Sequence, residues 1–244
     1  MELVLMAWSG GKDSAMALAN TLASPDYQVV ALLTTVTQGY DRISMHGVRR
    51  SLLKKQEEAL RIPLIEVPIS TKSSNEEYES NMAMALTKQR TNGVTSVVFG
   101  DIFLEDLRKY REDRLALVDM KCVFPLWKLD TKELAHSFIS SGFRAVTTCV
   151  DTKAIGREFV GREIDHSFLS ELPASADPCG ENGEYHSFVY DGPIFKNRIG
   201  FSIGEKVLRE ERFYYCDLIG EERPVLIRKK RSNKSLELSA KARV

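Results

Sequence analysis

The first half of the chain alternates short apolar runs with segments of helical periodicity, and this alternation restricts the fold more than any other feature. Four apolar runs have the length and composition of strands buried on both faces: residues 2–8, 27–36, 63–69 and 94–101. Three segments with helical spacing separate them: residues 13–23, 47–62 and 74–93. A β-α-β-α-β-α-β order implies a parallel sheet with helices on both faces. The sequence therefore predicts an α/β fold with a doubly wound parallel sheet.

The second half follows a different pattern and predicts a second, smaller α+β domain. Two further helices are expected, in the charged segment 105–120 and between the N-cap residue Asp130 and Gly142. Residues 143–151 read as a strand, the chain is loop-rich from about Pro173, and two alternating stretches predict antiparallel strands at 200–208 and 212–220. A boundary near Pro125 gives three parts: a nucleotide-type domain at 1–125, the smaller domain at 126–224 and a basic polar tail at 225–244.

Composition excludes several classes of protein. The formal net charge is +0, which gives no overall argument for binding nucleic acid or a membrane surface. No apolar run is long enough to cross a bilayer, and the N-terminus lacks the features of a signal peptide. The four cysteines are widely spaced, so we expect reduced thiols in a cytoplasmic protein.

The turn after the first predicted strand has the composition of a phosphate-binding loop. It consists of Ser9, Gly10, Gly11, Lys12, Asp13 and Ser14. Ligands of open α/β sheets bind at the carboxyl ends of the strands, and glycines there let backbone N–H groups approach an anion. Asp13 suits a Mg²⁺ ion that bridges it to the phosphates, or a helix cap. The spacing differs from the Walker motif, and a plain capped turn with a solvated Lys12 is the alternative.

A second group of polar residues follows the fourth predicted strand. Gly100 and Asp101 stand at its carboxyl end, on the side of the sheet where the phosphate loop is expected. Asp101 could hold Mg²⁺ or a substrate amine. Arg108 and Arg111 lie three residues apart on the next helix, so they share a face and could clamp a phosphate or carboxylate. An ordinary surface pair between Arg108 and Glu112 is the alternative.

The segment 177–193 concentrates polar residues between glycines. Within it stand Asp177, Cys179, Gly180, Glu181, Glu184, Tyr185 and His186. Its residues allow four interpretations: a metal site, a nucleophilic Cys179, a substrate cradle, or a structural cluster of polar turns.

These motifs resemble those of a known family. The loop at 9–14 resembles the pyrophosphate-binding motif of the N-type ATP pyrophosphatases. The segment 177–193 is similar to the signature of the diphthine–ammonia ligases, as are the residues around Asp101, the run Phe124–Trp127 and the run 145–151. The resemblance covers about residues 2–219. It implies a HUP-type α/β domain that binds ATP, with a smaller domain that carries the second signature.

The resemblance also implies a reaction. A carboxylate of diphthine on elongation factor 2 is adenylylated by ATP, pyrophosphate leaves, and ammonia then displaces AMP to form an amide. Residues 44–53 resemble a bacterial-type branch of the family. We therefore expect diphthine as the acceptor if the chain is archaeal or eukaryotic, and otherwise an unknown small molecule or protein.

The residues and the resemblance together predict individual roles. Catalytic roles are expected for Lys12, Asp101, Glu184 and His186, with Glu184 or His186 as general base and His46 as a further candidate for that role. ATP is expected on the loop 9–14 together with Thr34 and Arg108, and Mg²⁺ on Asp13 and Asp101. The acceptor is expected on His46, Cys179, Gly180, Glu181, Glu184 and Tyr185.

Two other functions share the first loop or the fold. One is a tRNA-modifying ATP pyrophosphatase, which usually needs paired cysteines or a basic RNA-binding face. The other is a non-enzymatic module that binds adenine nucleotides. No membrane partner is expected, and the apolar stretch 213–219 could be a homodimer interface as easily as core.

Overall fold

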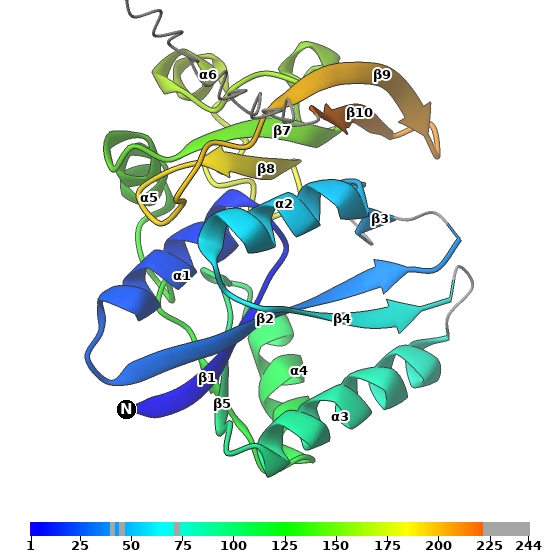
Figure 1. The fold of residues 1–244 in the computed structure, drawn as a ribbon. Coiled ribbons are helices and arrows are strands. Elements are labelled where there is room, and N and C mark those ends of the chain that lie inside the picture. Colours follow the sequence, from blue (N-terminus) through cyan, green and yellow to red (C-terminus); the bar gives the residue numbers. More distant parts are fainter. Residues whose placement is uncertain (40–41, 44–46, 71–73, 222–244) are drawn as a thin grey trace, which may run out of the picture.

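The computed structural model describes residues 1–39, 42–43, 47–70 and 74–221. His46 and the tail 225–244 therefore lie outside the described residues. Two sheets are stacked with helices between them and below them, as Figure 1 shows.

The first half forms the predicted parallel sheet. Its parallel strands are β1 (Glu2–Ala7), β2 (Tyr27–Thr37), β4 (Leu64–Ile69), β5 (Ser96–Val98) and β6 (Lys121–Val123). They lie side by side in the order β4-β2-β1-β5-β6, and the two-residue strand β3 (Arg42–Ile43) pairs antiparallel with the end of β2. This is the doubly wound order, and it confirms the predicted α/β class.

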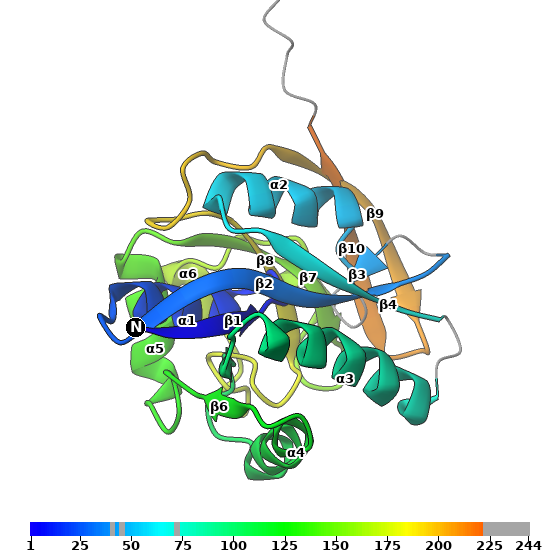
Figure 2. The same ribbon diagram turned by 60° about the horizontal axis from the view of Figure 1, so that its bottom comes forward.

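Helices cover both faces of this sheet. They are α1 (Lys12–Ala23), α2 (Arg50–Leu60), α3 (Asn75–Thr91) and α4 (Glu105–Ala116). The residues of β1 show which helices cover which face of the sheet, because successive side chains of a strand point to opposite faces. Val4 and Met6 join the cluster under α1 and α2, whereas Leu5 joins the cluster under α3 and α4. Figure 2 shows α3 and α4 on one side of the sheet and α1 and α2 on the other.

The second half forms an antiparallel sheet with the order β8-β7-β10-β9. Its strands are β7 (Arg144–Asp151), β8 (Tyr185–Asp191), β9 (Phe201–Arg209) and β10 (Phe213–Gly220). Strands β7, β9 and β10 were expected. Strand β8 was not, since it falls inside the segment read as loop-rich from Pro173. Glycine-rich turns precede this strand and polar residues interrupt it, so its local sequence is only a weak strand signal. The residues form a strand because they pair with β7.

Three further helical segments flank this sheet: α5 (Thr131–Ser140), the 3₁₀ turn η1 (Arg157–Phe159) and α6 (His166–Glu171). The predicted N-cap of α5 is confirmed, because Asp130 accepts a hydrogen bond from the Glu133 amide at 2.9 Å. Helix α6, which has six residues, was not predicted.

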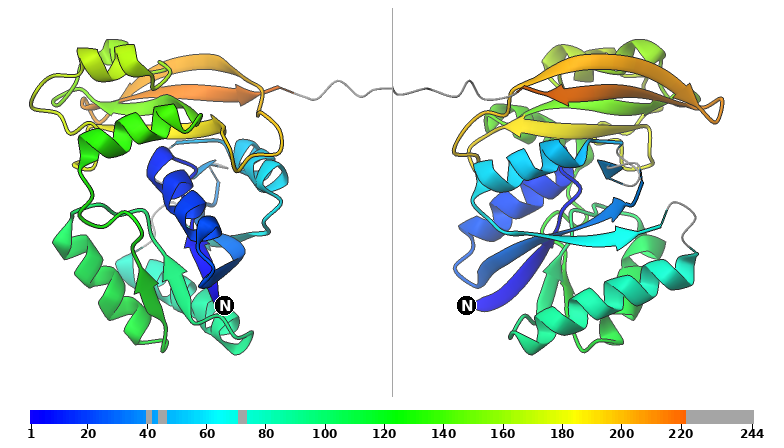
Figure 3. Two further views of the ribbon diagram at one scale, coloured as in Figure 1. Left: turned by 90° about the vertical axis from the view of Figure 1, so that its left-hand side faces the viewer. Right: turned by 45° about the vertical axis from the view of Figure 1, so that its right-hand side comes forward.

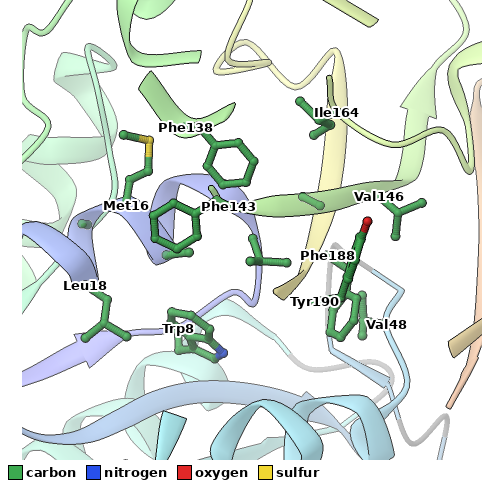
Figure 4. Packing of buried hydrophobic residues seen from close by; sticks show 14 of the residues in the cluster. Trp8, Met16, Leu18, Val48, Phe138, Phe143, Val146, Ile164, Phe188 and Tyr190 are labelled. Atoms are coloured by element: carbon green, nitrogen blue, oxygen red, sulfur yellow. The ribbon is translucent and has the colours of Figure 1, made fainter. Parts of the chain in front are cut away.

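One buried cluster joins the two sheets. Helices α1 and α2 lie between them, as the two views of Figure 3 show. In Figure 4, Met16 of α1 lies beside Phe138 and Phe143, and Val48 lies near Tyr190 of β8. The antiparallel sheet therefore packs on the outer face of α1 and α2, and it holds β8 directly above the start of α1.

Candidate active site

The predicted phosphate loop lies where the order of the parallel sheet reverses. The loop follows β1, and Gly100 and Asp101 follow its neighbour β5. The two turns touch, because a Cβ added to Gly100 would lie 2.8 Å from the carbonyl carbon of Asp13. A doubly wound sheet binds its ligands at this point, so the fold brings the first two predicted groups together.

Buried hydrogen bonds from α2 and β8 hold the loop. Gly10 has φ 78°, and its carbonyl accepts hydrogen bonds from Gln56 Nε2 (3.0 Å) and from the Val189 amide (2.9 Å). Gln56 is fully buried in α2, and its Oε1 accepts a hydrogen bond from Trp8 Nε1 at 2.9 Å. The sequence did not single out Gln56 as a site residue. The signal that could have identified it is a glutamine in line with the apolar residues of the predicted helix 47–62.

Lys12 is the buried cation of the loop. It is 3% exposed, its Nζ lies 2.5 Å from Asp13 Oδ1, and it stands 5.5 Å from the centre of the Tyr185 ring. Burial favours the neutral amine, but the adjacent Asp13 carboxylate outweighs it and raises the pKa of Lys12 above its ordinary value. Lys12 is therefore a fixed positive charge. Its amide donates to Ser187 Oγ of β8 at 3.1 Å, a contact that the sequence did not indicate.

The two serines of the loop order its backbone. Ser9 Oγ accepts a hydrogen bond from the Gly11 amide (3.2 Å) and donates to Ser14 Oγ (3.1 Å). Ser14 Oγ donates to the Gly11 carbonyl at 2.9 Å. Helix α1 begins at Lys12, so the loop presents the positive end of a helix dipole to an anion.

A cavity of about 590 Å³ opens beside the loop. Its floor consists of the ends of β1, β2 and β5, and α3 and α4 supply the remaining wall. Ser9, Thr34 and Thr35 line it, as do apolar side chains such as Met82 and Leu86. A mostly apolar cavity of this size with a few polar groups suits a small-molecule ligand.

Arg108 and Arg111 were expected to share one face of α4, but in the structure they have different partners. Asp101 is 8% exposed and pairs with Arg111, whose Nε lies 2.8 Å from Oδ2 and whose Nη2 donates to Oδ1 at 3.1 Å. Arg108 instead pairs with Glu112 at 2.8 Å, and its guanidinium carbon lies 4.6 Å from the centre of the Trp127 ring. Of the two, Arg111 is among the residues that line the cavity.

The segment 177–186 forms a tight turn around the carboxylate of Glu184. This side chain is 5% exposed and accepts hydrogen bonds from the Asp177 amide (2.9 Å) and the Asn182 amide (3.0 Å). Asp177 Oδ2 accepts two more, from the amides of Cys179 (3.1 Å) and Glu181 (2.9 Å). These contacts favour a role for Glu184 in shaping the turn.

The remaining side chains of the segment face the loop or the core. Cys179 is 2% exposed, and its thiol donates to the Thr131 carbonyl at 3.2 Å. Burial raises the pKa of this thiol to about 12, which favours an unreactive thiol over a nucleophile. Gly180 donates its amide to the Asp177 carbonyl at 2.8 Å, and the Tyr185 hydroxyl donates to the Pro178 carbonyl at 2.6 Å.

Glu181 connects the signature segment to the parallel sheet. Its Oε1 accepts a hydrogen bond from the Ile102 amide at 2.7 Å, directly after Asp101. Burial raises the pKa of Glu181 to about 7, and the negative charges of Asp13 and Asp101 add to this effect. A carboxyl group that titrates near neutral pH beside a phosphate loop has the properties of a proton acceptor.

His186 lies on β8, where burial lowers its pKa to about 4 and the charge of Lys12 adds to the effect. Its imidazole is therefore neutral at physiological pH.

In the described part of the chain, no three His, Cys, Asp or Glu side chains gather closely enough to hold a metal ion by themselves. All four cysteines are free thiols, as predicted. No described helix has the length and apolar content that a membrane span needs.

The fold and the site define a doubly wound α/β protein with a glycine-rich loop at the reversal of strand order. Comparison with protein families agrees with this class and narrows it. The model of the diphthamide synthase N-terminal domain matches residues 2–120, and that of the diphthamide synthase C-terminal domain matches residues 130–220. The chain belongs to the diphthamide synthase family.

Individual relatives are distant. A diphthine–ammonia ligase of Schizosaccharomyces pombe is 26% identical over 215 residues, which are 80% of this chain and 35% of that protein, so the chain spans about a third of its length. The human diphthine–ammonia ligase is 25% identical over 225 residues, 82% of this chain and 83% of the relative. A crystal structure of a predicted tRNA methyltransferase subunit from Methanocaldococcus jannaschii covers 82% of this chain and 100% of its own, but its TM-score of 0.41 and 15% identity carry no assignment.

Proposed function

We propose that the protein is an ATP-dependent ligase that adenylylates a carboxylate acceptor, releases pyrophosphate and forms an amide with ammonia. The observation that carries the proposal is the continuity of loop and cavity. Ser9 belongs to both, so a nucleoside in the cavity and a triphosphate on the loop can be parts of one molecule. Membership of the diphthamide synthase family supports the choice of reaction.

ATP would bind with its adenosine in the cavity and its outer phosphates on the loop. Thr34 and Thr35 of β2 line the cavity, and their backbone groups can form hydrogen bonds with the adenine base. Lys12 and the N-terminus of α1 supply positive charge for the β- and γ-phosphates. Pyrophosphate is then the leaving group that this loop stabilises.

Mg²⁺ fits the donor set beside the loop. Asp13 and Asp101 offer carboxylate oxygens, the ligands that this ion prefers, and Mg²⁺ commonly uses one or two carboxylates together with substrate phosphates. An ion held by these two residues would neutralise charge on the phosphates.

The chemistry then proceeds in two balanced steps. A carboxylate oxygen of the acceptor attacks the α-phosphorus, and the bond to pyrophosphate breaks. Ammonia attacks the acyl carbon, AMP leaves with the bonding electron pair, and the nitrogen gives up a proton. Glu181 is the proton acceptor that suits this step best, because its pKa of about 7 lies near neutral pH, whereas the lowered pKa of His186 makes it a weaker base. The names of the relatives favour diphthine as the acceptor.

The test is acceptor-dependent release of pyrophosphate. The full chain is incubated with Mg²⁺, ATP, ammonium and elongation factor 2 that carries diphthine, and pyrophosphate, AMP and amide are measured. Equal amounts of the three products are expected, and Lys12→Ala should abolish them. Pyrophosphate release that Lys12→Ala leaves unchanged would contradict the loop assignment. ATP binding without product would leave the fold's nucleotide site intact and reject diphthine as the acceptor.

A further inference from the structure

We infer that Arg111 is the arginine that binds the α-phosphate of ATP, and that Asp101 positions it. The inference rests on the proposed function and adds a catalytic residue to it. Three observations carry it: the location of Arg111 between cavity and loop, the support of its guanidinium group, and the charge of the site.

The location follows from α4 and β5. Arg111 lines the same cavity as Ser9, and its guanidinium group is bound to Asp101 at the end of β5. The Gly100–Asp101 turn contacts the backbone of Asp13 in the loop. Arg111 thus lies where the cavity meets the loop. In a nucleoside triphosphate, the group that joins the adenosine to the outer phosphates is the α-phosphate.

The guanidinium group is held in a fixed orientation. Asp101 contacts its Nε and Nη2, and its carbon lies 4.4 Å from the centre of the Phe99 ring. These two contacts with Asp101 do not involve Nη1. Because a guanidinium group has five N–H donors in all, donors remain available for a ligand. The side chain is 29% exposed, so a ligand in the cavity can reach it. Because Asp101 and the Phe99 ring already hold this planar group, it loses little entropy when it binds a phosphate.

The charge of the site requires such a cation. ATP brings about four negative charges into a region that already contains the carboxyl groups of Asp13, Asp101 and Glu181. Lys12 and Arg111 each pair with one of these carboxylates, Lys12 with Asp13 and Arg111 with Asp101. The other arginine of the cavity lining, Arg114, pairs with Glu79 at 2.7 Å. Of the two arginines that line the cavity, Arg111 is the one whose partner, Asp101, lies in the turn that contacts the loop.

Arg108 provides a matched control from the same helix. It lies three residues earlier on α4, it is similarly exposed (35%), and it also pairs with one carboxylate and stacks on aromatic rings. Its partners are Glu112, Phe124 and Trp127, and it is not among the described residues that line the cavity. The two arginines therefore differ mainly in what they face.

Equilibrium binding separates the α-phosphate from the rest of the nucleotide. The affinities of adenosine, AMP and Mg·ATP are measured by calorimetry for the full chain and for Arg111→Ala, Arg108→Ala and Lys12→Ala. Arg111→Ala should weaken AMP by about tenfold or more and leave adenosine unchanged, because only AMP carries the α-phosphate. Arg108→Ala should change AMP affinity by less than about threefold. Lys12→Ala should weaken ATP relative to AMP.

A chemical rescue distinguishes a phosphate contact from a structural role. Added guanidinium ion at millimolar concentration should restore AMP binding to Arg111→Ala, since it can occupy the place between Asp101 and Phe99. Equal losses of adenosine and AMP affinity would show that Arg111 only shapes the cavity, and a larger loss from Arg108→Ala would exchange the two roles. Either result overturns the inference but leaves the proposed function standing. If the unmodified chain binds neither ATP nor adenosine, the proposed function fails as well.

Discussion

At the scale of single residues, Gly10 shows how closely the phosphate loop is packed. Its φ of 78° is unfavourable for any residue with a side chain, and a Cβ there would lie 2.7 Å from Gln56 Oε1. Gly142 has a similar φ of 84° with open space around it. Comparing alanine substitutions at these two glycines therefore separates the cost of the backbone conformation from the cost of a steric clash.

We predict that Gly10→Ala destabilises the protein more than Gly142→Ala does. The second change should cost only the left-handed backbone penalty, about 1–2 kcal/mol. The first adds the displacement of a buried, hydrogen-bonded amide. Urea unfolding measures both free energies. Equal losses would show that the contact between Gly10 and Gln56 gives way without cost.

Glu181 makes a prediction about pH. Its folded pKa of about 7 lies above the ordinary value of 4.5, so the folded state holds this proton more tightly than the unfolded state does. The group therefore stabilises the fold fully below about pH 4.5, and this contribution is lost as the pH rises to about 7.

Glu181→Gln should remove that part of the pH dependence. The difference in unfolding free energy between the variant and the parent chain should change steadily between about pH 4.5 and 7 and be constant above this range. Glu58→Gln, at an exposed position of α2, is the control for the substitution of a glutamate by glutamine. A flat difference for Glu181→Gln would mean that its carboxyl group is ionised throughout.

At the scale of elements, α2 fixes the loop through one side chain. Gln56 joins Trp8 at the end of β1, Gly10 in the loop and Val189 in β8. Most of the helix boundaries followed from local signals, such as the Asp130 cap of α5. The role of Gln56 depends on three segments far apart in the sequence, and no local signal reports it.

Gln56→Leu should reduce both stability and nucleotide affinity. It leaves the buried Trp8 N–H and two carbonyl groups without this partner, which we expect to cost about 1–3 kcal/mol for each group that stays unsatisfied. Asp130→Ala is the control, because it should cost about 1 kcal/mol through the lost cap of α5 and leave Mg·ATP affinity unchanged. Unfolding and calorimetry measure the two quantities. Unchanged affinity in Gln56→Leu would show that the loop keeps its shape without the tether.

At the scale of the whole molecule, the two sheets share one buried cluster. Phe188 of β8 is fully buried, and the same cluster contains Trp8 at the end of β1. The sheets should therefore unfold together, although the sequence predicted two domains.

Phe188→Ala tests this cooperativity. The chain has two tryptophans, so in a Trp127→Phe background the fluorescence of Trp8, at the end of β1, reports when the parallel sheet unfolds. Removing the Phe188 ring should lower the unfolding free energy seen by Trp8 by about 3–5 kcal/mol. A Trp8 transition that does not move would show that the two sheets unfold independently.

The sequence by itself determined the α/β class, the order of the first four parallel strands along the chain and the position of the glycine-rich loop after β1. These follow from local periodicity and from the glycines of residues 9–14, which act at short range. Only the tertiary structure decided which polar side chains meet there. The rotation of α4 over β5 brings Arg111 rather than Arg108 to Asp101, and the stacking of the antiparallel sheet on α1 brings Glu181 to the Ile102 amide. Such contacts join distant segments, so their geometry depends on how whole elements pack and not on any local pattern.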